Sequence, residues 1–214
     1  MTHEKLILSP RFEQALLYAT TIHAGQTRKG TGIPFVAHLM SVASIALEHG
    51  ANEDEAIAAL LHDAVEKAGG EQRLEDIRAR FGEKVAEIVE GCTEPQGRPK
   101  PPWRARKAAF IGHMPRTLEP VRLVAAADKL SNARIILRDL RVMGDSVWTR
   151  YVGGKEGMLW YYRCLVQAFK TAGINPIVEE LERVVAEIER LSKIKESESP
   201  PAAQAHPAPP AHKH

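Results

Sequence analysis

The sequence of 214 residues contains little cysteine, few aromatic residues and no long apolar run. Its two cysteines, Cys92 and Cys164, are too few for a disulfide framework and form no CxxC pair, which favours free thiols in a reducing compartment. No stretch approaches the roughly 18 consecutive apolar residues that a membrane span requires. The N-terminal segment is too polar for a signal peptide. These absences predict a cytoplasmic protein without a membrane partner.

The charge is nearly balanced, with a formal net charge of +2. Such a balance provides no global field that would attract nucleic acid or an anionic membrane surface, so we expect neither as a partner. Hydrophobic residues make up 44% of the chain and charged residues 26%, as is usual for a folded protein. The length suits one sizeable domain. The oligomeric state stays open, a homo-oligomer included.

Apolar residues recur with a helical period, and glycine or proline stands at the expected helix ends. The predicted helices run from Ser9 to His23, Val36 to Glu48, Glu53 to about Lys67, Glu71 to Arg80, Glu83 to Cys92, Trp103 to Met114, Leu118 to Met143, Lys155 to Ala172 and Pro176 to Ile194. No run alternates with a period of two. The fold class that this pattern predicts is all-α, a single helical bundle.

Two segments are predicted to lack regular structure. Thr93–Pro102 (TEPQGRPKPP) contains four prolines, which exclude both helix and central strand. Residues 196–214 (ESESPPAAQAHPAPPAHKH) are rich in proline and alanine and have no periodic apolar face, so we expect a disordered C-terminal tail. One domain would then occupy residues 1–195.

The third predicted helix contains His62 next to Asp63, flanked on both sides by apolar residues. Neighbouring positions on a helix are about 100° apart, so both side chains could lean toward one metal ion. A capped or solvated pair is the alternative. The apolar flanks favour half-burial, however, and burying such groups without partners costs several kcal/mol. Glu66 lies one turn further on the same side, where a carboxylate could handle a proton of metal-bound water.

Two other polar positions could complete the same site. His38 begins the second predicted helix, where a backbone carbonyl could satisfy it instead. Asp128 follows an apolar stretch inside the longest predicted helix, and Asn132 repeats the polar position one turn later. Solvent exposure could explain Asp128, but two short polar side chains stacked on an apolar helix indicate a lined pocket.

These motifs, in this order, resemble the HD superfamily of metal-dependent phosphohydrolases. More narrowly, residues 23–29 (HAGQTRK) and 32–38 (GIPFVAH), together with LLHDAVE and ADKLSNAR, resemble the hydrolase domain of RelA/SpoT-type alarmone enzymes and the small alarmone hydrolases. The similarity covers about residues 10–175. It implies an HD domain that hydrolyses a phosphorylated nucleotide, with removal of the 3′-pyrophosphate from guanosine tetra- or pentaphosphate as the precedent.

The resemblance also implies roles for individual residues. The ligands of a divalent metal, usually manganese in this family, would be His38, His62, Asp63 and Asp128. Glu66 would position or deprotonate the metal-bound water. Arg28 and Lys29 would bind the substrate, Arg28 by stacking on or pairing with the nucleotide, and Asn132 would hydrogen-bond its ribose or phosphate.

One residue departs from the family pattern. Alarmone hydrolases usually have a Glu-Asp pair after the HD helix, and here the pair is Glu66-Lys67. Lys67 lies one turn beyond Asp63, so we expect it to point at the metal pocket, where it would offset negative charge and grip a phosphate. The same departure supports an alternative, a catalytically weakened protein that binds metal and nucleotide as a sensor. A purely structural bundle is the third hypothesis.

Two other segments are weaker candidates for substrate contacts. Arg98–Lys107 gathers five cations around Trp103, which suits either a solvated loop or a rim that grips phosphate. The segment GKEG…WYYR is similar to segments of small bacterial HD proteins that resemble alarmone hydrolases. That similarity implies a role for Lys155 and Arg163 in the substrate wall.

Overall fold

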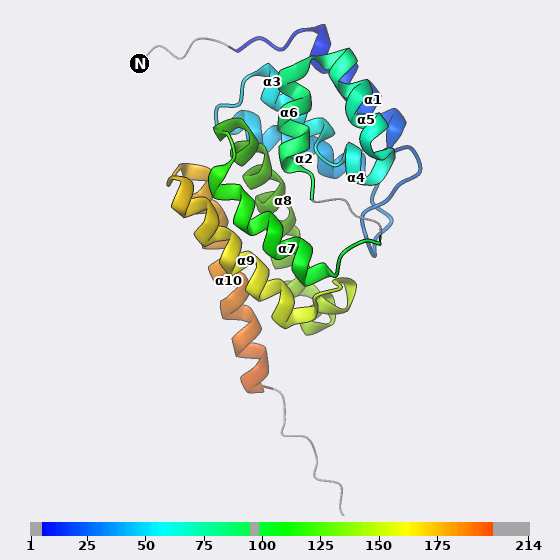
Figure 1. Cartoon of the computed structure of the whole chain (residues 1–214). Helices are drawn as coiled ribbons and strands as arrows, with labels where there is room; N and C mark the ends of the chain where they lie inside the picture. Colours follow the sequence, from blue (N-terminus) through cyan, green and yellow to red (C-terminus); the bar gives the residue numbers. More distant parts are fainter. Residues whose placement is uncertain (1–5, 95–98, 199–214) are drawn as a thin grey trace, which may run out of the picture.

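The computed structural model describes residues 6–94 and 99–198, the last five of these as backbone only. Within these ranges the chain is helical and contains no strand, only an isolated bridge between Thr27 and Pro34. The helices pack around one continuous apolar core (Figure 1). The predicted all-α bundle is confirmed.

The elements follow one another in the order of the chain. They are α1 (Pro10–Ile22), α2 (Val36–Glu48), α3 (Glu53–Leu61), α4 (Ala64–Ala68), α5 (Gly70–Phe81), α6 (Glu83–Cys92), α7 (Trp103–His113), the 3₁₀ helix η1 (Met114–Arg116), α8 (Glu119–Met143), the 3₁₀ helix η2 (Gly144–Arg150), α9 (Gly154–Ala172) and α10 (Pro176–Glu198).

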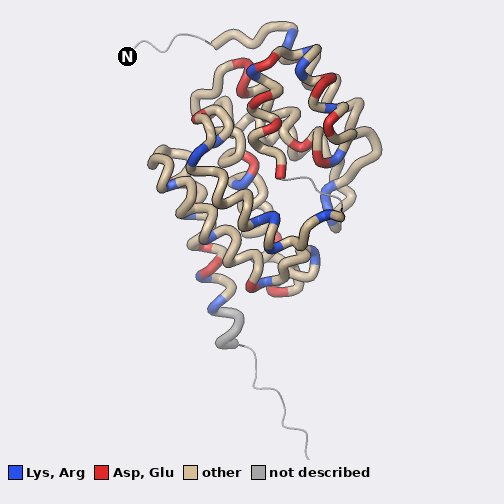
Figure 2. The backbone as a smooth tube through the Cα atoms, in the orientation of Figure 1, with Lys and Arg blue, Asp and Glu red and all other residues tan. Residues whose placement is uncertain are grey.

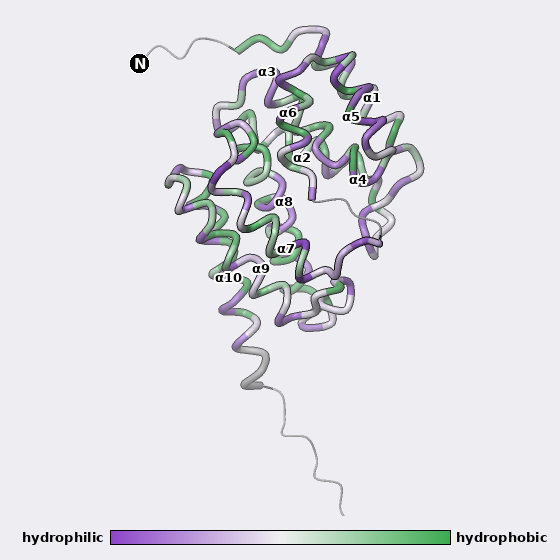
Figure 3. Tube along the Cα trace, viewed as in Figure 1, coloured by the Kyte–Doolittle hydropathy of each residue, from purple (hydrophilic) through white to green (hydrophobic). Residues whose placement is uncertain are grey.

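The long helix α8 lies in the middle of the bundle and packs against α2, α3, α6 and α10 (Figure 1). Its N-terminal half contains the buried run Val124–Ala127, whose three alanines leave room for neighbouring helices to approach closely. In Figure 3 hydrophobic and hydrophilic residues alternate along the helices, as expected for amphipathic helices around a shared core. Within the described residues no helix is long and apolar enough to cross a bilayer.

Local capping explains where two helices begin. The Ser9 hydroxyl accepts a hydrogen bond from the Arg11 N–H at 3.2 Å, and Pro10 occupies the first turn of α1. At α3, the Asn52 side chain accepts from the Glu55 N–H at 3.1 Å, while the Glu55 carboxylate accepts from the Asn52 N–H at 2.7 Å. This reciprocal pair is a capping box and confirms the predicted start of the helix.

The prediction of one continuous helix over Glu53–Lys67 is wrong, because α3 ends at Leu61 and α4 begins at Ala64. In an unbroken helix the Ala59 carbonyl would accept the N–H of Asp63. Here the His62 ring takes that acceptor, with Nδ1 2.8 Å from the Ala59 oxygen, and Asp63 adopts φ −95° and ψ −2°. The histidine and aspartate therefore lie at a turn between two helices.

The segments predicted to be irregular are described only in part. Residues 93–94 and 99–102 are non-helical, in agreement with the prediction, and residues 95–98 lie outside the described chain. Helix α10 continues to Glu198, so the first three residues of the predicted tail are helical. The remainder of that tail, residues 199–214, lies outside the described residues.

Two helical glycines provide a matched test of packing against α8. A Cβ added at Gly91 in α6 would lie 2.7 Å from Val121 Cγ2, on a stiff, buried side chain. A Cβ added at Gly112 in α7 would meet nothing within 4 Å. We expect Gly91→Ala to lower the free energy of unfolding by about 1–3 kcal/mol through overpacking. Gly112→Ala should raise it by roughly 0.5–1 kcal/mol through helix propensity.

Urea titrations of both variants measure these changes. Changes in the free energy of unfolding that are equal in size and direction for the two variants would contradict this packing of α6 on α8.

Candidate metal centre

A pocket of about 750 Å³ is lined by residues of the 26–35 loop, α2, the His62–Lys67 turn, α7, α8, η2 and α9. It contains nine residues singled out from the sequence: Arg28, Lys29, His38, His62, Asp63, Glu66, Lys67, Asp128 and Asn132. Helix α7, at one side of this pocket, carries Lys and Arg but no Asp or Glu (Figure 2). The fold thus brings segments far apart in the sequence to one charged cavity.

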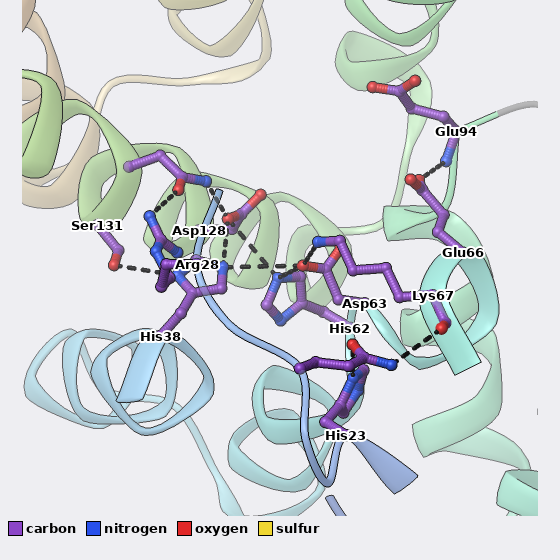
Figure 4. A network of polar contacts seen from close by, with 12 residues as sticks. His23, Arg28, His38, His62, Asp63, Glu66, Lys67, Glu94, Asp128 and Ser131 are labelled. Carbon is purple, nitrogen blue, oxygen red and sulfur yellow. Dashed lines mark hydrogen bonds and ion pairs between the residues drawn. The ribbon is translucent and has the colours of Figure 1, made fainter. Parts of the chain in front are cut away.

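Side chains from α2, from the turn after α3 and from α8 meet at the pocket (Figure 4). His38 Nε2 lies 3.1 Å from Asp128 Oδ1, and His62 Nε2 lies 3.6 Å from the same oxygen. One ligand atom of each residue lies within 4.8 Å of the other two, and all three residues are buried. Two imidazole nitrogens and a carboxylate at this spacing could hold a divalent ion.

In each histidine, the contact made by the second ring nitrogen, Nδ1, fixes the orientation of the ring. Because a carbonyl only accepts, His62 Nδ1 carries the proton and donates to Ala59, which leaves Nε2 with a lone pair. His38 Nδ1 lies 3.4 Å from Ser131 Oγ. His62 Nε2 is buried and has no hydrogen-bond partner within the described chain. An unpartnered buried nitrogen is costly, so the residues present fit a metal ion.

The charged neighbours set the protonation of this group. Burial alone would lower the pKa of His62, but the carboxylates of Asp63 and Asp128 outweigh it and raise that pKa. For His38 burial outweighs the contact with Asp128, and its pKa is lowered. The pKa of Asp128 lies well below its ordinary value despite burial, because Lys129 and both histidines favour the anion.

Asp63 lies beside the three-residue group. Its Oδ2 is 3.5 Å from His62 Nε2 and 3.9 Å from His38 Nε2. The ammonium of Lys67 pairs with that same oxygen, and it also lies 4.3 Å from the centre of the Phe35 ring. Despite burial, His62 and Lys67 lower the pKa of Asp63 to about 2. Lys67 thus points at the pocket, as its position in the sequence suggests.

A chain of hydrogen bonds connects the 26–35 loop to the same centre. Arg28 Nη2 donates to Asn132 Oδ1 at 2.8 Å, and Asn132 Nδ2 donates to Asp128 Oδ1 at 2.6 Å. Lys29, the next residue of the loop, also lines the pocket. A ligand that engages Arg28 would therefore lie close to Asp128.

Glu66 occupies the opposite side of the centre (Figure 4). Its Oε1 accepts a hydrogen bond from the Glu94 N–H at 2.7 Å, which holds the carboxylate in place. Burial raises the pKa of Glu66, and the negative charges of Asp63 and Glu94 raise it further. A pocket carboxylate with a raised pKa is suited to accept a proton from water near neutral pH.

Two lysines of the pocket were missed as individual candidates. Lys129 Nζ donates to Asp128 Oδ2 at 2.6 Å, and this ion pair outweighs burial and raises the pKa of Lys129 well above its ordinary value. Lys107 pairs with Glu94, while burial lowers the pKa of Lys107. Lys129 follows directly after Asp128 in an apolar run, so the argument that identified Asp128 would have identified it too.

The sequence allowed two interpretations of the cationic segment around Trp103, a solvated loop or a rim that grips phosphate, and its residues divide between them. Trp103 and Lys107 line the pocket. Arg106 pairs with Glu94 at 3.1 Å, and Arg104 lies over the Trp160 ring at 3.6 Å. Within the described residues, the rim that the sequence suggested therefore consists of Trp103 and the half-buried Lys107.

Lys155 and Arg163 are not brought to this pocket, contrary to the expectation from the sequence. Lys155 Nζ lies 3.1 Å from Asp145 Oδ2 and 3.1 Å from the Ser192 carbonyl. Arg163 Nε donates to Glu189 at 2.9 Å on an exposed face. Both side chains attach α9 to its neighbours, because the face of α9 that carries them turns toward α10 and η2.

The pocket lining includes a second charged group that the sequence did not indicate. Asp139 is buried and pairs with Arg150 at 2.8 Å and with Arg138 at 2.8 Å. All three line the pocket together with Tyr151. The pocket lining thus includes two arginines, Arg138 and Arg150, besides Arg28.

Residues 15–158 match the family described as HD domain. The guanosine-3′,5′-bis(diphosphate) 3′-pyrophosphohydrolase MESH1 of Xenopus tropicalis is 35% identical over 170 residues, 78% of this chain and 87% of that protein. Among solved structures, a metazoan ortholog of SpoT that hydrolyses ppGpp is similar with a TM-score of 0.70 and 26% identity, covering 86% of this chain and 98% of that chain. A protein of Listeria monocytogenes EGD-e has a TM-score of 0.62 and 31% identity, covering 74% and 99%.

The metal centre can be tested by melting with and without a divalent ion. The full chain should first have its tail histidines, His206, His212 and His214, replaced by alanine, because they could bind metal adventitiously. Manganese at roughly one hundred times its Kd should then raise the Tm by about 5–10 °C, since a ligand specific for the native state stabilises it.

His62→Ala should abolish this shift, whereas His113→Ala, at an exposed position of α7, should preserve it. A full shift in His62→Ala would place the ion elsewhere.

Proposed function

This chain belongs to the HD domain family, and from that premise we propose a metal-dependent phosphohydrolase that acts on a phosphorylated nucleotide. The specific activity proposed is that of a guanosine 3′,5′-bis(diphosphate) 3′-pyrophosphohydrolase. The observation that carries the proposal is the buried group of His38, His62 and Asp128 in a cavity that arginines and lysines also line. A polyphosphate needs such cations beyond its metal contacts.

We propose manganese as the resident ion, held by His38, His62 and Asp128 with Asp63 as the fourth ligand. Imidazole and carboxylate donors together suit a borderline-hard divalent ion of this kind. When bound, the ion supplies a water of lowered pKa and polarises a phosphate oxygen.

The proton of the attacking water goes to Glu66 in this proposal. The Glu94 N–H holds the carboxylate in place, and its raised pKa brings it closer to the working pH of a general base. The hydrogen bond to Ala59 leaves the lone pair of His62 on Nε2, where the metal ion would occupy it, so the ring would not serve as the base.

The nucleotide is bound by the other groups that line the cavity. Arg28 offers a planar face for stacking and a fork of donors for phosphate, and Asn132 positions it. Lys29 adds charge from the same loop. Lys107 and Lys129 stabilise negative charge at the metal end. Nucleic acid is not proposed as a partner, and the cytoplasmic location and a homo-oligomer stay predictions.

A second candidate function follows from Lys67. Its ammonium pairs with Asp63. At position 67, next to Glu66, the family usually has an acidic residue instead. A chain that keeps metal and nucleotide binding but has lost turnover would act as a sensor or regulator. Appearance of hydrolysis only in Lys67→Asp would favour this candidate over the leading one.

Turnover on a panel of nucleotides tests the leading proposal. With manganese added, the wild-type chain should release pyrophosphate from guanosine 3′,5′-bis(diphosphate) faster than from GTP or ATP, as the name of its MESH1 relative suggests. Release of neither phosphate nor pyrophosphate from any member, with metal bound, would contradict a hydrolase.

Glu66→Gln tests the proposed general base. The amide oxygen can still accept from the Glu94 N–H, so the fold should be unchanged while kcat falls about 10²–10⁴-fold with little change in KM. Glu71→Gln, in the first turn of α5, is the surface control. If Glu66→Gln keeps the wild-type kcat at equal metal content, Glu66 is not the general base.

A further inference from the structure

Lys67 makes more contacts than a surface lysine usually does. Its ammonium pairs with Asp63 Oδ2 and lies 4.3 Å from the centre of the Phe35 ring. Its backbone is also fixed, because the Lys67 N–H donates to the Asp63 carbonyl at 3.1 Å and the Gln26 side chain donates to the Lys67 carbonyl at 3.2 Å. The ammonium is therefore held above the metal centre by both its side chain and its helix (Figure 4).

The paired oxygen is the one that faces the histidines. Asp63 Oδ2 lies 3.5 Å from His62 Nε2 and 3.9 Å from His38 Nε2, whereas Lys129 pairs with the other oxygen of Asp128, Oδ2, and leaves Asp128 Oδ1 toward the histidines. A lysine thus contacts a carboxylate on each side of the centre. Lys129 leaves Asp128 Oδ1 without a paired cation in the described chain, although Asn132 donates to that oxygen, whereas Lys67 pairs with the histidine-facing oxygen of Asp63 itself.

We propose that Lys67 is an internal cation that sets the metal affinity of this centre by competing with the divalent ion for Asp63. The inference rests on the proposed metal centre. Two positive charges cannot share one carboxylate oxygen without mutual repulsion, so the ion binds against the Lys67–Asp63 pair. Asp63 is the ligand for which Lys67 and the ion compete, whereas no lysine among the described residues pairs with the ligand atoms that His38, His62 and Asp128 present to the ion.

The competition has a consequence for stability that differs with metal content. In the absence of metal, the Lys67 ammonium offsets the negative charge of Asp63, which lies near Asp128. Removing that ammonium leaves the two carboxylates with stronger mutual repulsion. With metal bound, the same lysine opposes the ion. Loss of the Lys67 charge should therefore destabilise the metal-free protein and favour the metal-bound one.

The test is a titration of manganese by calorimetry, using the full chain with its tail histidines replaced by alanine. Lys67→Met removes the charge but keeps the length of the side chain over Phe35, and should bind manganese about tenfold more tightly. Lys67→Arg keeps the charge and should stay within about twofold of wild type. Lys29→Met is the matched control, because Lys29 lines the same pocket and makes no ion pair within the described chain.

Melting curves give the second readout. In EDTA, Lys67→Met should melt below wild type, and with saturating manganese this difference should vanish or reverse. Lys67 is 42% exposed, so Lys67→Met should fold, and Lys67→Gln provides a second neutral variant.

Equal manganese affinity in wild type and both neutral variants would overturn the inference, as would equal tightening in Lys67→Arg. Binding of manganese is measured without substrate, so failure here leaves the hydrolase proposal intact. Absence of turnover would leave the affinity result unaffected.

Discussion

The hydrogen bond from His62 Nδ1 to the Ala59 carbonyl is the contact on which the site depends. By taking an acceptor that the helix would otherwise use, it ends α3 at Leu61 and places Asp63 in a turn. The same bond fixes the tautomer, so the buried Nε2 faces His38 and Asp128 without a hydrogen-bond partner in the described chain. One local interaction thus interrupts a helix and leaves a buried nitrogen facing the pocket.

Helix α8 supplies the compensating charges that allow such a polar group inside an apolar core. Asp128 is buried, and a buried carboxylate is stable only when it is paired. Lys129 takes one of its oxygens, while His38 and Asn132 contact the other. Because α8 packs against α2 and α3, these side chains meet the two histidines at the centre of the bundle, and the loop carrying Arg28 joins through Asn132.

Most of the helices could be predicted from the sequence, because helical period and capping residues are local signals, whereas the grouping of His38, His62 and Asp128 is predicted by the family resemblance of four separate motifs. The break after Leu61 could not be predicted, since it depends on a ring orientation that the helical period does not encode. Lys155 and Arg163 are polar residues on helix α9, and only packing against α10 decides that they face away from the cavity. The partner that a polar residue finds is set by tertiary structure.

We propose that this chain builds one divalent metal centre from His38, His62 and Asp128, with Asp63 shared between the ion and Lys67. The most direct measurement is anomalous diffraction at the manganese edge, on crystals grown with manganese from the chain lacking its tail histidines. We expect a single peak bordered by His38 Nε2, His62 Nε2 and Asp128 Oδ1. Absence of a peak there, or a peak elsewhere alone, would contradict it.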